Sequence, residues 1–353
     1  MKFSLFILPC YRPGLAPSMH HFYEELSEAV RLADRSGWDR VWVSEHHFHY
    51  YGGASPNPAM MLQGWARETK RIRLGTGIVL LPLNHPLRSA EDYALVDQMS
   101  GGRLDFGVGR GYLPHEFAGF NVGQDATLGK FDEAFEIIQK AWTGEPFAYD
   151  GAHYKFDTLR VHPQPFQKPV PVWVACSKSK DSFEGAAREG AHLMMNQYPM
   201  SVAQMQERFS WYKDAYEAAG HDPKKRQAMM SMFLNIADSE EQAIDEARLG
   251  VQEHANLFRL LTGKDQWSTD YVGDESVFKF LEPSGDVTKL FRERTLVGTA
   301  DQVCERIAFY RDQGYTEMSM VIRYGTLAHQ KVMDNIDRIN RLVRPRFQAK
   351  AAA

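Results

Sequence analysis

The 353-residue sequence predicts an α/β fold, a (β/α)8 TIM barrel with insertions, and three observations support this prediction. Eight apolar segments of strand length alternate with segments of helix length, which is the pattern of a parallel sheet. The expected strands are apolar at consecutive positions, as in residues 170–175, so both of their faces are expected to be covered. Eight such units fit one barrel domain spanning residues 1–353, and a doubly wound open sheet is the alternative.

Each predicted strand is a short apolar run that ends at polar, glycine or proline residues. The second strand stops at Glu45-His46-His47-Phe48, and the fourth stops at Gly109-Arg110-Gly111. The carboxyl ends of parallel strands carry functional side chains in α/β proteins, so these two segments are the first candidates for a site. The eight strands are expected at Lys2–Leu8, Arg40–Ser44, Arg73–Leu81, Leu104–Val108, Val170–Ala175, His192–Asn196, Gln227–Ile236 and Glu317–Ile322.

Helices are expected between these strands because apolar residues recur there every three or four positions, as at Phe22, Leu26, Ala29 and Ala33. Proline at a first helical position and glycine after a last one support several of the boundaries. The helices are expected at His21–Ser36, Pro58–Thr69, Arg88–Ser100, Leu128–Trp142, Asp181–Glu189, Val202–Ala219, Glu240–Leu261, Thr299–Gln313 and Leu327–Val343.

Two segments interrupt the alternation of strands and helices. Residues 147–171 contain a hairpin turn signal at 149–154 and four prolines, and are expected to be a hairpin and proline-rich insertion. Residues 263–293 mix aromatic residues with glycine and charged residues, without a clear period. We expect this second insertion to be a lid over the active site, with packing between subunits as the alternative.

The composition excludes several classes of function. The net charge of −4 gives no basic surface for nucleic acid or an anionic membrane, and no apolar run approaches the roughly 20 residues of a membrane span. Cys10, Cys176 and Cys304 match no metal or disulfide framework, so no metal is expected and a reducing compartment suits the chain. The first residues lack the features of a signal peptide, and a cytoplasmic location is expected.

The order of several motifs resembles the bacterial luciferase-like family of flavin-dependent monooxygenases, and in particular the alkanal monooxygenase alpha chain. Any one of these motifs alone would be weak support, whereas the ordered series over residues 40–112 is specific. The matching segments are 42–48 (WVSEHHF), 74–80 (LGTGIVL), 85–92 (HPLRSAED), 95–103 (LVDQMSGGR) and 106–111 (FGVGRG).

The resemblance implies a (β/α)8 barrel that uses reduced FMN and O2, through a flavin C4a-hydroperoxide, to oxygenate a small organic substrate. It also implies a separate NAD(P)H:flavin reductase, which agrees with the lack of a Gly-x-Gly-x-x-Gly nucleotide motif in this sequence. A homo-oligomer, either a dimer or a dimer of dimers, is expected. The alternatives are a deazaflavin-dependent enzyme of the same superfamily that transfers hydride, and a flavin-binding barrel without catalytic activity.

The tetrapeptide at the end of the second strand is the predicted catalytic segment. Histidine titrates near neutral pH and can accept or donate a proton, although a purely structural Glu-His pair is an equal alternative from the tetrapeptide itself. The resemblance assigns His46 to forming and using the flavin hydroperoxide. Glu45 is expected to set the tautomer of His46 or to pair elsewhere in the core, and His47 is expected to be structural or to face the substrate.

The cation Arg110 is the predicted phosphate ligand, because a guanidinium forms paired hydrogen bonds to phosphate and stays charged. Ser177 and Ser182, with the backbone N–H of Phe183, are expected to complete the phosphate site at the start of a helix. A structural arginine is the alternative for Arg110. For the helix start, the alternative is simple capping by Ser179 or Asp181.

The resemblance places the flavin ring against Thr76, Gly77 and Ile78, where some family members have a cis peptide bond. Gly109 stands where luciferase has a cysteine, so light emission is not expected. Tyr112, His115 and Glu116 follow the flavin arginine and are expected to shape the substrate pocket together with His47.

Overall fold

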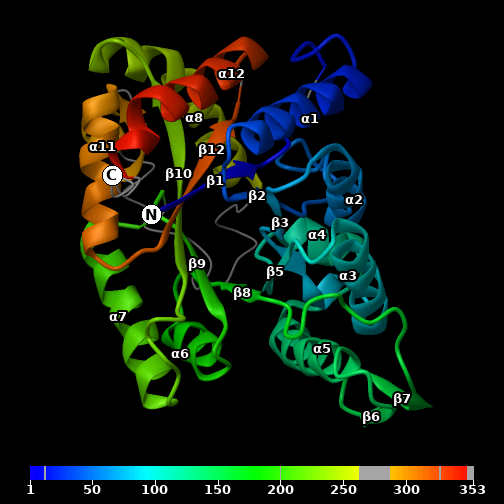
Figure 1. Ribbon diagram of the computed structural model, residues 1–353. Helices are drawn as coiled ribbons and strands as arrows, with labels where there is room; N and C mark the ends of the chain where they lie inside the picture. Colours follow the sequence, from blue (N-terminus) through cyan, green and yellow to red (C-terminus); the bar gives the residue numbers. More distant parts are fainter. Residues whose placement is uncertain (12, 199, 262–286, 326, 348–353) are drawn as a thin grey trace.

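The computed structural model describes residues 1–11, 13–198, 200–261, 287–325 and 327–347 (Figure 1). Within these residues eight parallel strands form a closed barrel, because β12 pairs with β1 and β9 pairs with β10. The barrel prediction is therefore confirmed, and the open sheet is wrong. In order around the barrel the strands are β1 (Lys2–Ile7), β2 (Arg40–Val43), β3 (Arg73–Thr76), β5 (Leu104–Gly109), β8 (Val172–Ala175), β9 (His192–Asn196), β10 (Ala228–Ile236) and β12 (Glu317–Arg323).

The helices cover the outside of the sheet, with α2, α3 and α5 on the right and α7 and α11 on the left of Figure 1. Their apolar faces pack on the strands, as Phe22, Leu26 and Ala33 of α1 do. The larger helices are α1 (Met19–Arg35), α2 (Pro58–Glu68), α3 (Pro86–Ser100), α5 (Thr127–Ala141), α6 (Lys180–Arg188), α7 (Val202–Ala218), α8 (Glu240–Leu261), α11 (Ala300–Asp312) and α12 (His329–Arg338). In the described ranges no helix combines the length and apolarity that crossing a membrane requires.

The structure differs from the sequence prediction at three short elements. The predicted third strand is divided, because β3 ends at Thr76 and β4 (Val79–Leu80) begins after a cis Gly77–Ile78 peptide bond. Helix α4 (Pro114–Gly119) and strand β11 (Leu296–Gly298) were not predicted. Both are shorter than two helical turns or four strand residues, so neither produces a recognisable hydrophobic period.

The two predicted insertions have different outcomes. Strands β6 (Phe147–Asp150) and β7 (Lys155–Leu159) form an antiparallel hairpin, and Glu133 of α5 accepts backbone hydrogen bonds from Ala152, His153 and Tyr154 in its turn. Most of the expected lid at 263–293 lies outside the described residues. Its last part belongs to helix α10 (Val287–Arg294).

The interior of the barrel is packed with large side chains. Trp42, Trp173, Met194 and Met229 form a buried cluster that Phe6 and Ile78 adjoin. Below this cluster, at the amino ends of the strands, Arg40 pairs with Asp105 and Glu317. The packed interior closes this end of the barrel, which leaves the carboxyl ends of the strands for a site.

Candidate active site

The carboxyl ends of neighbouring strands bring the predicted site residues to one end of the barrel, here called the mouth. His46 follows β2, Gly77 and Ile78 follow β3, Arg110 follows β5, and Ser177 follows β8. Gly77, Ile78 and Arg110 are half-buried, whereas the bodies of these strands are mostly buried. The mouth is therefore the open end of a barrel whose other end is packed.

His46 is held by a carboxylate from α4. Its Nδ1 lies 3.0 Å from Oε1 of Glu116, and the same oxygen accepts the backbone N–H of His47 at 2.8 Å. Glu116 is only 1% exposed. An ionised carboxylate can only accept hydrogen bonds, so this contact places the His46 proton on Nδ1 and leaves a lone pair on Nε2.

Glu45 does not set the tautomer of His46, and this part of the sequence prediction is wrong. Its carboxylate instead contacts His47 Nε2 at 3.1 Å and accepts hydrogen bonds from Leu80 N–H at 3.0 Å and Asn84 Nδ2 at 2.8 Å. Glu45 therefore pairs elsewhere, which was the stated alternative. It connects the end of β2 to the segment that follows the cis Gly77–Ile78 bond.

The imidazole of His46 is enclosed by aromatic rings and a glycine. A Cβ atom at Gly52 would lie 2.5 Å from His46 Cδ2, so only glycine allows the backbone this close. The Tyr51 ring centroid is 5.0 Å from that of His46, and the Tyr112 centroid is 6.0 Å away. His254 of α8 lies on the far side of Tyr51 at 5.0 Å. Burial, and then the nearby charge of His46, lower the pKa of His254 to about 3, so this imidazole is neutral at pH 7.

The expected flavin-ring segment forms a shallow wall at the mouth. A Cβ atom at Gly77 would lie 2.7 Å from the ring of Phe6, and one at Gly109 would lie 2.1 Å from Cδ1 of Ile78. A side chain at position 109 would therefore require the Ile78 side chain to move. Thr76 is fully buried and its hydroxyl bonds the backbone of Gly107, so its side chain joins β3 to β5.

The expected phosphate residues lie around the ends of β5 and β8. The charge of Arg110 acts on Asp132 of α5, whose pKa is raised by burial and lowered less strongly by Arg110. Ser177 and Ser182 are exposed. Ser179 caps α6 by accepting the N–H of Ser182, as the capping alternative stated. The N–H of Phe183 is bonded to the Ser179 carbonyl, so it is already used within the helix start.

The comparisons with known proteins agree with this geometry. Residues 1–317 match the family model described as luciferase-like monooxygenase. The chain belongs to this family. The luciferase-like resemblance is thereby confirmed, and the chain is an oxidoreductase of the oxygen-incorporating kind.

Individual relatives of this luciferase-like monooxygenase cover nearly the whole chain. The oxygenase component of a flavin-dependent trigonelline monooxygenase from Acinetobacter baylyi is 28% identical over 98% of this chain and 96% of its own length. The crystal structure of monooxygenase RslO1 from Streptomyces bottropensis is 30% identical, with a TM-score of 0.88, over 99% of this chain and 100% of that one. The oxygenating constituent of 3,6-diketocamphane monooxygenase from Pseudomonas putida, in complex with FMN, has a TM-score of 0.77 at 21% identity and covers 98% of both chains. This last likeness shows the fold alone.

Two residues of this luciferase-like site carried little or no signal in the sequence. Glu116 was expected only to shape the pocket, because its contact with His46 depends on the unpredicted α4. His254 occupies an ordinary position in a long amphipathic helix, and its neighbours Tyr51 and Tyr198 come from distant loops. His115 contacts the carbonyl oxygen of His47 through Nε2 at 3.0 Å, so it does lie with His47 as expected.

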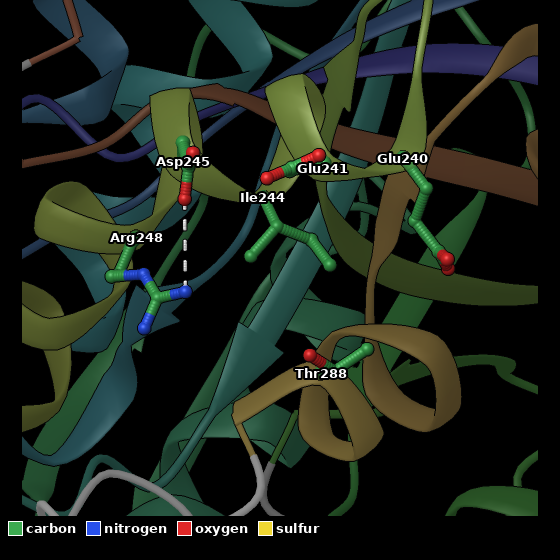
Figure 2. Close-up of a pocket in the computed structure, with 6 residues that line it drawn as sticks. All are labelled: Glu240, Glu241, Ile244, Asp245, Arg248 and Thr288. Atoms are coloured by element: carbon green, nitrogen blue, oxygen red, sulfur yellow. Dashed lines mark ion pairs between the residues drawn. The ribbon is translucent and has the colours of Figure 1, made fainter.

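The described residues outside the mouth were compared with two other kinds of site, a metal site and a surface pocket. No group of three or more His, Cys, Asp or Glu side chains within the described ranges is arranged to hold a metal ion. A surface pocket between the starts of α8 and α10 (Figure 2) is lined by none of the predicted site residues. Two of its three carboxylates are paired, Asp245 with Arg248 and Glu240 with Arg292. The pocket lining is Glu240, Glu241, Ile244, Asp245, Arg248 and Thr288.

Proposed function

We propose that the protein is an FMN-dependent monooxygenase that uses reduced FMN and O2 to oxygenate a small organic substrate. The observation that carries this proposal is the position of His46. Its Nε2 lone pair is available beside an open barrel end that also holds Gly77, Ile78 and Arg110. A relative that covers almost all of this chain is a flavin-dependent monooxygenase by name, which supports a flavin as the cofactor.

The residues at the mouth fit FMN. Gly77 and Gly109 pack closely against Phe6 and Ile78, and the half-buried backbone at Gly77 and Ile78 would be the surface that a flat ring contacts. Arg110 would hold the phosphate, and the exposed hydroxyls of Ser177 and Ser182 would add hydrogen bonds to it. When bound, reduced FMN supplies the electrons that activate O2.

His46 is proposed as the residue that moves a proton during oxygenation. Its Nε2 accepts a proton from the substrate or holds one near the reacting oxygen, and Glu116 stabilises the imidazolium that results. Gly52 and Tyr51 fix the orientation of the ring. Glu45 is proposed as a positioning residue. Its carboxylate accepts a hydrogen bond from the backbone N–H of Leu80 and so holds the segment that follows Ile78.

A separate NAD(P)H:flavin reductase is proposed to supply the reduced FMN. The trigonelline relative is described as an oxygenase component, which implies such a partner for that protein. We also propose a cytoplasmic homo-oligomer. Cys10, Cys176 and Cys304 form no disulfide bond with one another, as a reducing compartment requires.

Stopped-flow mixing of O2 with reduced FMN and the protein tests this function. Bound reduced FMN is expected to reach the oxidised state through a protein-dependent species absorbing in the near ultraviolet. The His46→Ala variant should bind reduced FMN as the parent does, yet lose substrate turnover by at least about 100-fold, the usual contribution of a general acid or base. Direct oxidation of bound reduced FMN without such a species would contradict the monooxygenase proposal. Full turnover by the variant would remove His46 from the chemistry.

A further inference from the structure

Three tyrosines at different strand ends pack their rings on a histidine, Tyr51 and Tyr112 on His46 and Tyr198 on His254. Tyr51 follows β2, Tyr112 follows β5 and Tyr198 follows β9. Tyr112 donates a hydrogen bond to the Tyr51 oxygen at 3.1 Å. The rings of Tyr51 and Tyr198 both contact the ring of His254, with centroid distances of 5.0 Å and 5.7 Å.

Two of these hydroxyls have a proton to donate. Tyr51 and Tyr198 are each 5% exposed. The Tyr51 oxygen accepts from Tyr112, and no hydrogen bond to a described residue uses the Tyr51 proton. The Tyr198 hydroxyl is buried and makes no hydrogen bond to any described residue. Burial raises the pKa of both phenols, so both remain protonated donors at pH 7.

A buried donor without an acceptor is unfavourable in a folded protein, and each such group requires an explanation. Two such donors, one beside His46 and the other beside His254, suggest a ligand that brings its own acceptor. Convergent polar groups in a largely apolar lining are also the usual anatomy of a small-molecule site.

Aromatic rings form the remainder of this wall. Phe233 lies 5.2 Å from Tyr198 and 4.7 Å from His254, measured between ring centroids. His254 is neutral and so acts here as one more ring. On the other side, Tyr51 packs with Leu8, Phe6 and Leu257, of which Phe6 and Leu257 are partly exposed and give access. Aromatic walls of this kind bind planar rings by edge-to-face and offset contacts.

We infer that the substrate is an aromatic compound carrying an oxygen acceptor, such as an aryl ketone or aldehyde, bound by the Tyr51 and Tyr198 hydroxyls against the His254 ring. This inference rests on the proposed function, because only a monooxygenase would use the bound molecule as its substrate. The hydroxyls donate to the acceptor oxygen, and the aromatic ring lies within reach of His46. Tyr51 and Tyr198 are thereby specificity residues that the sequence analysis did not select.

Three probes of nearly the same shape test the inference by ligand-observed NMR titration of the full chain, with and without FMN. Acetophenone has both the ring and the acceptor, α-methylstyrene lacks the acceptor, and acetylcyclohexane lacks the aromatic ring. Acetophenone is expected to bind about tenfold more tightly than either, because two neutral hydrogen bonds together are worth at least that factor. Isotope-edited infrared spectroscopy should show the bound carbonyl stretch at lower wavenumber than in an apolar solvent.

Single hydroxyl deletions provide matched variants. Tyr198→Phe and Tyr51→Phe should each weaken acetophenone about fivefold and leave α-methylstyrene unchanged. Tyr324→Phe is the control, because its ring also packs on Phe233 but its hydroxyl already donates to the Leu234 carbonyl. Tyr324→Phe should not alter the preference between the probes.

Equal affinity for acetophenone and α-methylstyrene, or an unchanged preference in both tyrosine variants, would overturn the inference. The outcome is separable from that of the proposed function, since no turnover is measured. Discrimination between the probes by a protein that fails to stabilise a flavin species would uphold this site and reject the monooxygenase chemistry. Normal oxygenation of other substrates by a protein that binds acetophenone and α-methylstyrene equally would uphold the monooxygenase chemistry and reject this site.

Discussion

The two ends of the barrel differ in how their buried carboxylates are paired. At the amino ends of the strands, Arg40 Nε lies 2.7 Å and Arg73 Nε lies 2.6 Å from Oδ2 of Asp105, and Trp42 donates to Glu317 at 2.8 Å. At the mouth, Oε2 of Glu116 and the hydroxyl of Tyr198 are buried without a hydrogen bond to any described residue. The paired charges at the amino end stabilise the fold, whereas the unpaired oxygen of Glu116 and the Tyr198 hydroxyl at the mouth are available to a ligand.

The charges at the amino end also hold one another in their ionised states. Burial would raise the pKa of Asp105, but Arg40 and Arg73 outweigh it and hold this pKa below its ordinary value. The pKa of Arg40 is raised, because Glu317 and Asp105 more than offset the effect of burial. Each charge is thus tolerated in the core only while its partners are present.

Removing Arg40 from the charged network at the amino end is expected to cause the largest loss of stability. Arg40→Met leaves Asp105 and Glu317 buried without their shared cation, which should cost about 3–5 kcal/mol of the free energy of unfolding. Urea denaturation measures this loss. FMN affinity of the molecules that remain folded should be unchanged, because the substitution lies at the far end of the barrel.

The triple variant Arg40→Met, Asp105→Asn, Glu317→Gln is the control, since it removes the two buried charges along with their partner. It should recover part of the lost stability. A loss below about 1 kcal/mol in the single variant would mean that the charged network does not support the fold, and the contrast between the two ends would fail.

The sequence predicted the scaffold better than the site, for a physical reason. The eight strands were found because burial on both faces demands continuous apolar runs, and strand ends such as Glu45-His46-His47 and Gly109-Arg110 mark the mouth. The partner of His46 could not be predicted in the same way. Glu45 adjoins His46 in the chain, yet Glu116 reaches it, because that contact depends on the direction of a six-residue helix.

Tyr51, Tyr198 and His254 escaped prediction for the same reason. They come from two loops and one helix that are adjacent only in the closed barrel, and none has a local motif. The segment at 176–183 had a local signal, and there the capping alternative describes the Ser182 N–H correctly.

At the mouth, Arg110→Ala is expected to weaken FMN binding without destabilising the fold. Loss of a charge-assisted contact to phosphate should cost about 1–3 kcal/mol in binding free energy. Fluorescence titration with FMN and with riboflavin, which lacks the phosphate, measures the effect. FMN should lose affinity and riboflavin should not. Equal losses for both ligands would instead make Arg110 a structural residue.

The smallest expected effect concerns two buried histidines, one at each end. Burial lowers the pKa of His192, near the amino end, to about 4; the charge of Asp105 opposes this shift, and Arg40 and Lys2 add to it more weakly. The pKa of His254, at the mouth, is lowered to about 3. Both folded-state values lie below the ordinary value near 6.5, so between these limits the unfolded chain binds protons that the folded chain does not. Stability is therefore complete above about pH 6.5 and falls as the pH is lowered toward 4.

Replacing each histidine by phenylalanine in turn measures how much each end of the barrel contributes to the pH dependence of stability. Either variant should reduce the loss of stability between pH 7 and pH 4.5 by on the order of 1–2 kcal/mol, measured by urea denaturation at several pH values. His192 also accepts a hydrogen bond from Gln227 Nε2 at 3.0 Å, so His192→Phe should cost about 1 kcal/mol at pH 7. His254 packs among aromatic rings, and His254→Phe should leave stability at pH 7 nearly unchanged. If His254→Phe were the more costly of the two at pH 7, the mouth would be the end whose polar groups stabilise the fold, and the contrast between the ends would be reversed.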